Sequence, residues 1–317
     1  MVRFMLERAA HPLGGEVARL PSTQGRMWWA MFSGDGRRIV TTDDGGAQVW
    51  DEIGHRLFPL PHGSTVYQAV FSPDGTRILT AGADGFVKVW DASTGSWIAS
   101  LSHERSSGSL QYSALAVSPD GTMIAAVHTT GTVVQVWDLR TGKFIREFAN
   151  DADAKNNPAL EFSHDNRWLA TTGGGDVRVY DTTTWQQALV VPGPEIRTIS
   201  FDPTGPRLAT ASRGDVSIWT VPGGVRERHL HESGDRVHHV AFSPDGAFVV
   251  AAAQDGTDRI WNARTGDLQV ELKNHHSAAV WAEFDPKSRL VVSSDVDGVV
   301  AISDVALRMT VGRDAGG

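Results

Sequence analysis

The sequence of 317 residues contains no cysteine. This absence excludes disulfide bonds, zinc sites built on thiolates and a cysteine nucleophile. Basic residues are also in the minority, because 29 Lys and Arg stand against 37 Asp and Glu, a net charge of −8. A protein that tracks nucleic-acid phosphates concentrates Lys and Arg on one face, so the acidic balance argues against nucleic acid as a partner.

Long hydrophobic runs are absent as well. No stretch approaches 18 consecutive apolar residues, so we expect no membrane span and no membrane partner. The first eight residues break a short apolar run with charge, which makes a poor secretory signal. With 41% hydrophobic and 21% charged residues the chain has the composition of a folded protein. A soluble, cytoplasmic protein is the expectation.

Motifs that carry chemistry are missing too. There is no G-x-S-x-G elbow, no phosphate-binding glycine loop and no H-E-x-x-H sequence. The loop at 150–157 has alternating oxygen ligands but lacks the glycine and the closing Glu of a calcium loop. We therefore expect no catalytic residue, no metal site, no cofactor and no enzyme activity.

What the sequence does contain is an internal repeat, marked twice. An apolar run ends in an aromatic–acidic pair or its remnant at residues 50–51, 90–91, 137–138, 180–181, 219–220, 261–262 and 303–304. An apolar strand also runs into a turn of the Ser-Pro-Asp-Gly type that begins at Phe32, Phe71, Val117, Phe162, Phe201, Phe242 and Phe284. Both markers count seven units at intervals of 39 to 47 residues. Such a period indicates a repeat architecture.

Each unit predicts four short strands. In the second unit, residues 66–72, 77–81, 86–90 and 96–101 are rich in β-forming residues, and Pro-Asp-Gly, Asp-Gly and Ser-Thr-Gly turns separate them. Their two faces are both largely apolar, as expected where each small sheet is covered on both sides. The sequence thus predicts an all-β fold of small stacked sheets.

The Trp-Asp ending, the Asp-Gly turn six residues before the Trp and the period of about 42 residues resemble the WD40 repeat of β-propellers. The Ser-Pro-Asp-Gly turns are similar to those of bacterial WD40 proteins. The resemblance implies a single seven-bladed propeller of four-stranded antiparallel blades over residues 15–311. Residues 1–14 are then an N-terminal extension or linker, and residues 312–317 a C-terminal tail. We favour closure of the ring by an N-terminal strand at 15–20, although a strand at 305–311 is an alternative.

In the family, a His, a Ser or Thr, a turn Asp and the Trp form a buried hydrogen-bonded tetrad. Only the second unit carries all four, as His62, Thr80, Asp84 and Trp90. The resemblance assigns these residues a structural role, since a satisfied buried network stiffens a blade.

The resemblance also implies a docking face that bears the loops between blades. Two positions in each unit contact partners in the family. Carried over, they give the partner-binding candidates Trp28, Asp43, Tyr67, Arg197, His238 and Gln254. Trp28 and Trp29 are adjacent, and we expect one of them to face into the blade.

These observations predict a non-catalytic scaffold that binds a protein or peptide, with a basic partner favoured by the net charge. Two alternatives stay open. One is a regulatory sensor module of a larger bacterial signalling protein or complex, and the remote one is a propeller enzyme such as a lactonase. The sequence does not determine the oligomeric state.

Overall fold

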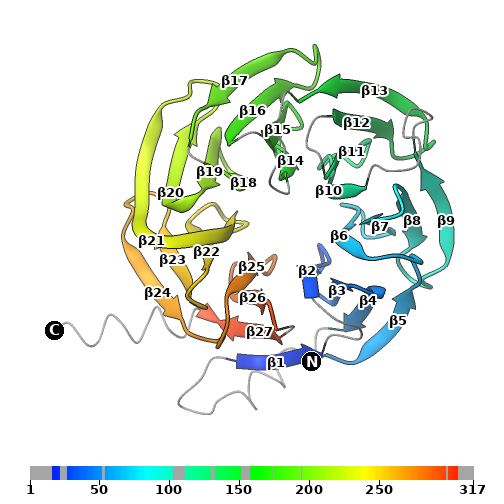
Figure 1. Ribbon diagram of the computed structural model, residues 1–317, viewed down its shortest axis with the longest axis horizontal. Coiled ribbons are helices and arrows are strands. Elements are labelled where there is room, and N and C mark those ends of the chain that lie inside the picture. Colours follow the sequence, from blue (N-terminus) through cyan, green and yellow to red (C-terminus); the bar gives the residue numbers. More distant parts are fainter. Residues whose placement is uncertain are drawn as a thin grey trace.

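The computed structural model describes residues 16–21, 27–51, 54–102, 111–129, 133–150, 158–173, 175–193, 195–297 and 299–305. The expected extension at 1–14, the tail at 312–317 and most of the alternative closing strand at 305–311 lie outside these residues. The described part contains 27 strands in antiparallel sheets that surround a central axis (Figure 1). Among the described residues, no helix has the length and hydropathy needed to cross a membrane.

Five sheets have four strands each. One consists of β2 (Met27–Phe32), β3 (Arg38–Asp43), β4 (Gly46–Asp51) and β5 (Arg56–Leu60). The next consists of β6 (Val66–Phe71), β7 (Arg77–Gly82), β8 (Val87–Asp91) and β9 (Trp97–Leu101). Then follow β10 (Tyr112–Val117), β11 (Met123–His128), β12 (Val133–Asp138) and β13 (Phe144–Ala149). The fourth has β14 (Leu160–Phe162), β15 (Trp168–Gly173), β16 (Asp176–Asp181) and β17 (Gln187–Val191).

The fifth four-stranded sheet joins the two ends of the described chain. It contains β25 (Ala279–Phe284), β26 (Leu290–Asp295), β27 (Val299–Asp304) and β1 (Glu16–Pro21), in the order β1-β27-β26-β25. Strand β1 pairs with β27 in antiparallel register, from Glu16 opposite Ser303 to Pro21 opposite Val299. The N-terminal strand therefore closes the ring, which leaves β27 with no open edge.

The prediction of seven four-stranded blades is wrong. The structure has five four-stranded blades, and the other strands form one continuous seven-stranded sheet. Its strands are β18 (Thr198–Phe201), β19 (Arg207–Ala211), β20 (Arg213–Thr220), β21 (Arg226–Phe242), β22 (Phe248–Ala253), β23 (Asp258–Asn262) and β24 (Leu268–Leu272).

The long strand β21 is the cause of this difference. Its first part pairs with β20 as far as Arg236, and from Val237 onward it pairs with β22. Proline stands in three of the connections between other sheets, at Pro61, Pro158 and Pro192, and it interrupts a hydrogen-bonded ladder. The stretch 226–242 has no proline, and it continues as one strand from the rim to the axis (Figure 1).

The core lies between neighbouring sheets. In one cluster, Leu79 and Val87 of one sheet pack with Leu115, Ile124 and Trp137 of the next, and all five are at most 1% exposed. Burial of such side chains contributes about 1.5–3 kcal/mol each. The apolar faces on both sides of each sheet, read from the sequence, are thus used for packing between sheets.

Candidate functional site

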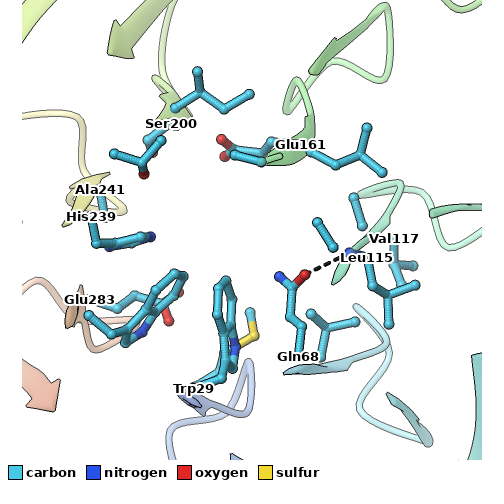
Figure 2. A pocket seen from close by; sticks show the side chains of 18 of the residues that line it. Trp29, Gln68, Leu115, Val117, Glu161, Ser200, His239, Ala241 and Glu283 are labelled. Atoms are coloured by element: carbon cyan, nitrogen blue, oxygen red, sulfur yellow. Dashed lines mark hydrogen bonds between the residues drawn. The ribbon is translucent and has the colours of Figure 1, made fainter. Parts of the chain in front are cut away.

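The first strand of each repeat lies next to the central axis, and together these strands line a channel with a volume of about 710 Å³. Figure 2 shows side chains from several of these strands pointing toward one another across it. Such a volume is typical of a small-molecule or side-chain pocket. One end of the channel is surrounded by the turns with the Ser-Pro-Asp-Gly pattern, and the other end is called here the mouth. The mouth is lined by Trp28, Tyr67, Ser113, Pro158, Arg197, His238 and Val280.

Backbone irregularities explain why the mouth residues turn toward the axis. The pairing register shifts between Met27 and Trp29, between Val66 and Gln68, and between Val237 and His239. A β-bulge adds one residue and redirects its side chain. Trp28 and Trp29 both line the channel, and Trp29 also packs against the core cluster that contains Phe32 and Trp50.

Two of the candidate residues form an aromatic corner at the mouth. The rings of Trp28 and Tyr67 meet edge to face, with centroids 5.5 Å apart. Trp28 Nε1 donates a 2.8 Å hydrogen bond to Asp44 Oδ1, and Tyr67 Oη donates one of 2.9 Å to Gln111 Oε1. Both rings are held in place and remain partly exposed, which suits an anchoring surface.

The opposite side of the mouth is basic. Glu195 Oε2 lies 3.8 Å from Arg197 Nη2 and 2.8 Å from Arg213 Nε. His238 Nε2 donates a 2.8 Å hydrogen bond to Gln254 Oε1. Burial lowers the pKa of His238, and the positive charges of Arg236 and Arg197 lower it further, so this imidazole is neutral at pH 7.

Asp43 differs from the other candidates. It is only 2% exposed, and its Oδ1 accepts a 2.9 Å hydrogen bond from the backbone N–H of Gly45. The carboxylate therefore closes the turn between β3 and β4. The neighbouring Asp44 is the acidic residue that contacts Trp28.

The four tetrad residues lie in one hydrogen-bonded chain. Trp90 Nε1 donates to Thr80 Oγ1 at 2.8 Å, Thr80 lies 2.7 Å from His62 Nδ1, and His62 Nε2 lies 2.9 Å from Asp84 Oδ1. Burial lowers the pKa of His62, so the neutral ring accepts from the hydroxyl and donates to the carboxylate. Burial opposes ionisation of Asp84, but hydrogen bonds from Lys88 and His62 outweigh it and keep its pKa below the ordinary value.

Deeper in the channel lie residues that the sequence analysis did not select. One layer consists of the residues just before the last residue of each first strand: Met31, Val70, Ala116, Glu161, Ser200, Ala241 and Glu283. The next layer toward the mouth includes Trp29, Gln68, His239 and Trp281. The sequence contains a signal for these two residues. At this position of the repeat the other five units have a small or apolar residue, and only Glu161 and Glu283 are acidic.

Most polar side chains in these layers form a hydrogen bond with the backbone of the first strand of the following repeat. Gln68 Oε1 accepts from Leu115 N at 2.6 Å (Figure 2). Glu161 Oε2 accepts from Phe201 N at 3.0 Å. His239 Nδ1 donates to the carbonyl oxygen of Ala282 at 2.8 Å. These bonds satisfy backbone groups at the inner edge of each sheet and connect neighbouring sheets.

Burial changes the protonation of the deep residues. It raises the pKa of Glu161 to about 8, assisted by the charge of Glu283, and it raises the pKa of Glu283 to about 8 as well. Burial lowers the pKa of His239 to about 3. At pH 7 all three side chains are therefore predominantly neutral. No group of three or more His, Asp or Glu side chains in the described ranges could hold a metal ion.

The ring of antiparallel sheets and the tetrad are similar to those of WD40 β-propellers. The WD domain, G-beta repeat family matches residues 55–91, 157–181, 185–220 and 224–262. These four segments of the chain are thus similar to WD40 repeats.

Several full-length proteins are similar to it. A protein LST8 homolog of Drosophila melanogaster is 28% identical over 71% of this chain and 74% of its own length. A serine-threonine kinase receptor-associated protein of Dictyostelium discoideum is 24% identical over 78% of this chain and 84% of its own. A WD repeat-containing protein 26 homolog of Arabidopsis thaliana is 22% identical over 92% of this chain, which spans only 51% of that relative. These relatives are eukaryotic and do not support the resemblance to bacterial WD40 proteins.

Proposed function

We propose that this chain is a non-catalytic scaffold that docks a protein or peptide segment over the mouth of the channel. The observation that carries the proposal is the mouth itself, where Trp28, Tyr67 and Arg197 are held in fixed positions around a deep opening. Aromatic residues and arginine dominate the energetics of protein interfaces. The WD40 relatives support a protein-binding scaffold, since their names include a receptor-associated protein and a complex subunit.

The charges of the mouth refine the expected partner. Asp44 stands beside the aromatic corner, whereas Arg197, Arg213 and Arg236 stand on the other side. A segment that places a basic residue near Trp28 and an acidic residue near Arg197 matches both sides. The net charge of −8 adds a long-range attraction for basic partners that salt weakens. We place this interaction in the cytoplasm.

The test is affinity capture from source lysate, with mass spectrometry and repetition on purified components. It compares the wild type with the variant Trp28→Ala/Tyr67→Ala/Arg197→Ala. The matched control is Trp97→Ala/Phe144→Ala/Arg228→Ala, which removes two exposed aromatic residues and an exposed arginine from outer strands. Circular dichroism establishes that all three proteins are folded.

We expect the wild type and the control to retain the partner and the mouth variant to lose it. Equal binding by all three proteins would overturn the assignment of the mouth. Loss only in the control would place the interaction on the outer strands instead. If the chain is instead a sensor module of a larger protein or complex, its native mass in lysate should exceed the summed mass of this chain and its partner. Size-exclusion chromatography measures this native mass.

A further inference from the structure

The deep channel contains polar atoms that the fold does not use. Glu283 Oε2, Trp281 Nε1 and Trp29 Nε1 are buried and have no hydrogen-bond partner in the part of the chain that the structure describes. Native proteins pair nearly all buried polar groups, and each exception requires an explanation. Glu161, Gln68 and His239 each bind the adjacent strand, so the missing bond of Glu283 is an exception to the pattern of this channel.

These groups surround one space. Glu161 and Glu283 come from first strands on different sides of the axis, and Figure 2 shows both carboxyl groups directed into the channel. Trp29, Trp281 and His239 contact one another and form an aromatic wall beside Glu283. Trp281 lines the channel and is only 7% exposed, because it also packs in the core cluster that contains Phe32 and Trp50.

The chemistry of this space favours a positive group. The faces of indole rings attract cations, and carboxylates bind guanidinium and ammonium groups with strong hydrogen bonds. His239 is neutral, because burial lowers its pKa to about 3, and it does not repel a cation. The other titratable groups lining the channel in the described residues stand at its two ends: Tyr67, Arg197 and His238 at the mouth and His164 among the turns.

We propose that the deep channel binds an organic cation, a guanidinium or ammonium group on an alkyl stem, between Glu161 and Glu283 and against Trp29 and Trp281. The inference rests on the proposed function in one respect, because an arginine or lysine side chain of a docked segment is one source of this cation. A free small amine or guanidine is the other source. The two sources share the same chemistry at the carboxyl groups.

Binding of the cation is coupled to release of protons. In the empty channel the two carboxyl groups are predominantly protonated at pH 7, since burial raises the pKa of each to about 8. A cation stabilises the carboxylate form, so each carboxyl group that ionises gives its proton to solvent. The affinity for a permanent cation therefore rises with pH below about 8, by up to tenfold per pH unit for each proton released.

Isothermal titration calorimetry with n-butylguanidinium tests this inference. Titrations at pH 6, 7 and 8, each in two buffers of different ionisation enthalpy, give the affinity and the number of protons released. The matched ligand is n-butylurea, which has a similar shape and no charge. We expect n-butylguanidinium to bind with release of protons and n-butylurea to bind at least tenfold more weakly.

Two substitutions locate the site. Glu283→Gln should weaken n-butylguanidinium binding at pH 8 at least tenfold and reduce proton release. Glu271→Gln makes the same chemical change on the outer strand β24, where Glu271 Oε1 pairs with Arg259 Nε at 3.1 Å, and should leave binding unchanged. Equal binding of n-butylurea, or unchanged affinity in Glu283→Gln, would overturn the inference.

A peptide arm separates the two sources of the cation. The pentapeptide acetyl-Gly-Gly-Arg-Gly-Gly-amide and its citrulline counterpart are titrated in the same way. Tighter binding of the arginine peptide than of n-butylguanidinium indicates a docked segment as the source, and the reverse order indicates a free ligand. The mouth variant Trp28→Ala/Tyr67→Ala/Arg197→Ala leaves Glu161 and Glu283 in place. If no partner is captured but n-butylguanidinium binds, the proposed function fails alone; if the mouth retains a partner but n-butylguanidinium does not bind, this inference fails alone.

Discussion

The hydroxyl group of Thr80 is the centre of the tetrad, and Thr80→Val tests what the tetrad contributes to stability. The substitution keeps the shape of the side chain and removes the oxygen that connects Trp90 with His62. All three residues are at most 3% exposed, so water cannot replace the lost bonds. Each buried group left without a partner costs about 1–3 kcal/mol.

A second unit provides the control. Trp50 Nε1 donates a 2.8 Å hydrogen bond to Thr41 Oγ1 in the same way, but no histidine of the described ranges adds to this pair. Thr41→Val therefore leaves one buried group unpaired, whereas Thr80→Val leaves two. We expect Thr80→Val to lower the free energy of unfolding by about 1–3 kcal/mol more than Thr41→Val does.

The measurement is equilibrium urea unfolding, followed by tryptophan fluorescence and by circular dichroism at constant pH. The dependence on urea should be the same for both variants, so that the difference in midpoint reports stability. If the two variants lose equal stability within about 0.5 kcal/mol, the bond between Thr80 and His62 contributes nothing and the reasoning is refuted.

Three further predictions concern buried acids and one turn. The contribution of Glu161 and Glu283 to stability should fall as pH rises from about 4.5 to 8, because both stay protonated in the folded state and ionise in the unfolded one. The double variant Glu161→Gln/Glu283→Gln should therefore gain stability relative to the wild type as pH rises over this range, measured by thermal unfolding at several pH values. Burial also raises the pKa of Asp258 to about 8, so Asp258→Asn should raise the melting temperature more at pH 8 than at pH 5, and an equal change would contradict the cause. Gly256→Ala should destabilise more than Gly121→Ala in urea unfolding: both glycines have positive φ, +77° and +70°, but only at Gly256 would a Cβ lie 2.6 Å from a backbone oxygen. Equal losses, at the roughly 1–2 kcal/mol of left-handed strain alone, would rule out that contact.

The local structure could be predicted from the sequence because short-range chemistry determines it. In the second unit the expected strands at 66–72 and 77–81 are observed as Val66–Phe71 and Arg77–Gly82. The turn between them forms because the Ser72 hydroxyl donates to Asp74 Oδ1 and Gly75 adopts a φ of +68°. These interactions lie within a few residues, and the sequence pattern records them directly.

The division into blades and the inner surface of the channel could not be predicted in this way. Whether β21 breaks into two strands depends on hydrogen bonds to β20 and to β22, which pair with different parts of it. The orientation of Trp29 depends on a bulge in its pairing with β3, and strict alternation along the strand does not reveal a bulge. Glu161 and Glu283 are separated by more than 100 residues, and only closure of the ring brings them to one channel.

The inner edge of the sheets connects stability with function in this protein. First strands such as β6 and β14 are edge strands of their sheets, so their backbone groups on the channel side have no partner strand. Side chains of the preceding sheet supply that partner, as Glu161 does for Phe201. The polar side chains Gln68, Glu161 and His239 therefore help to hold neighbouring sheets together around the channel. Glu283 has the same position in its strand, but its Oε2 reaches no such group. Glu283 Oε2 therefore does not join the sheets as Glu161 does, and it is the atom to which we assign the proposed cation.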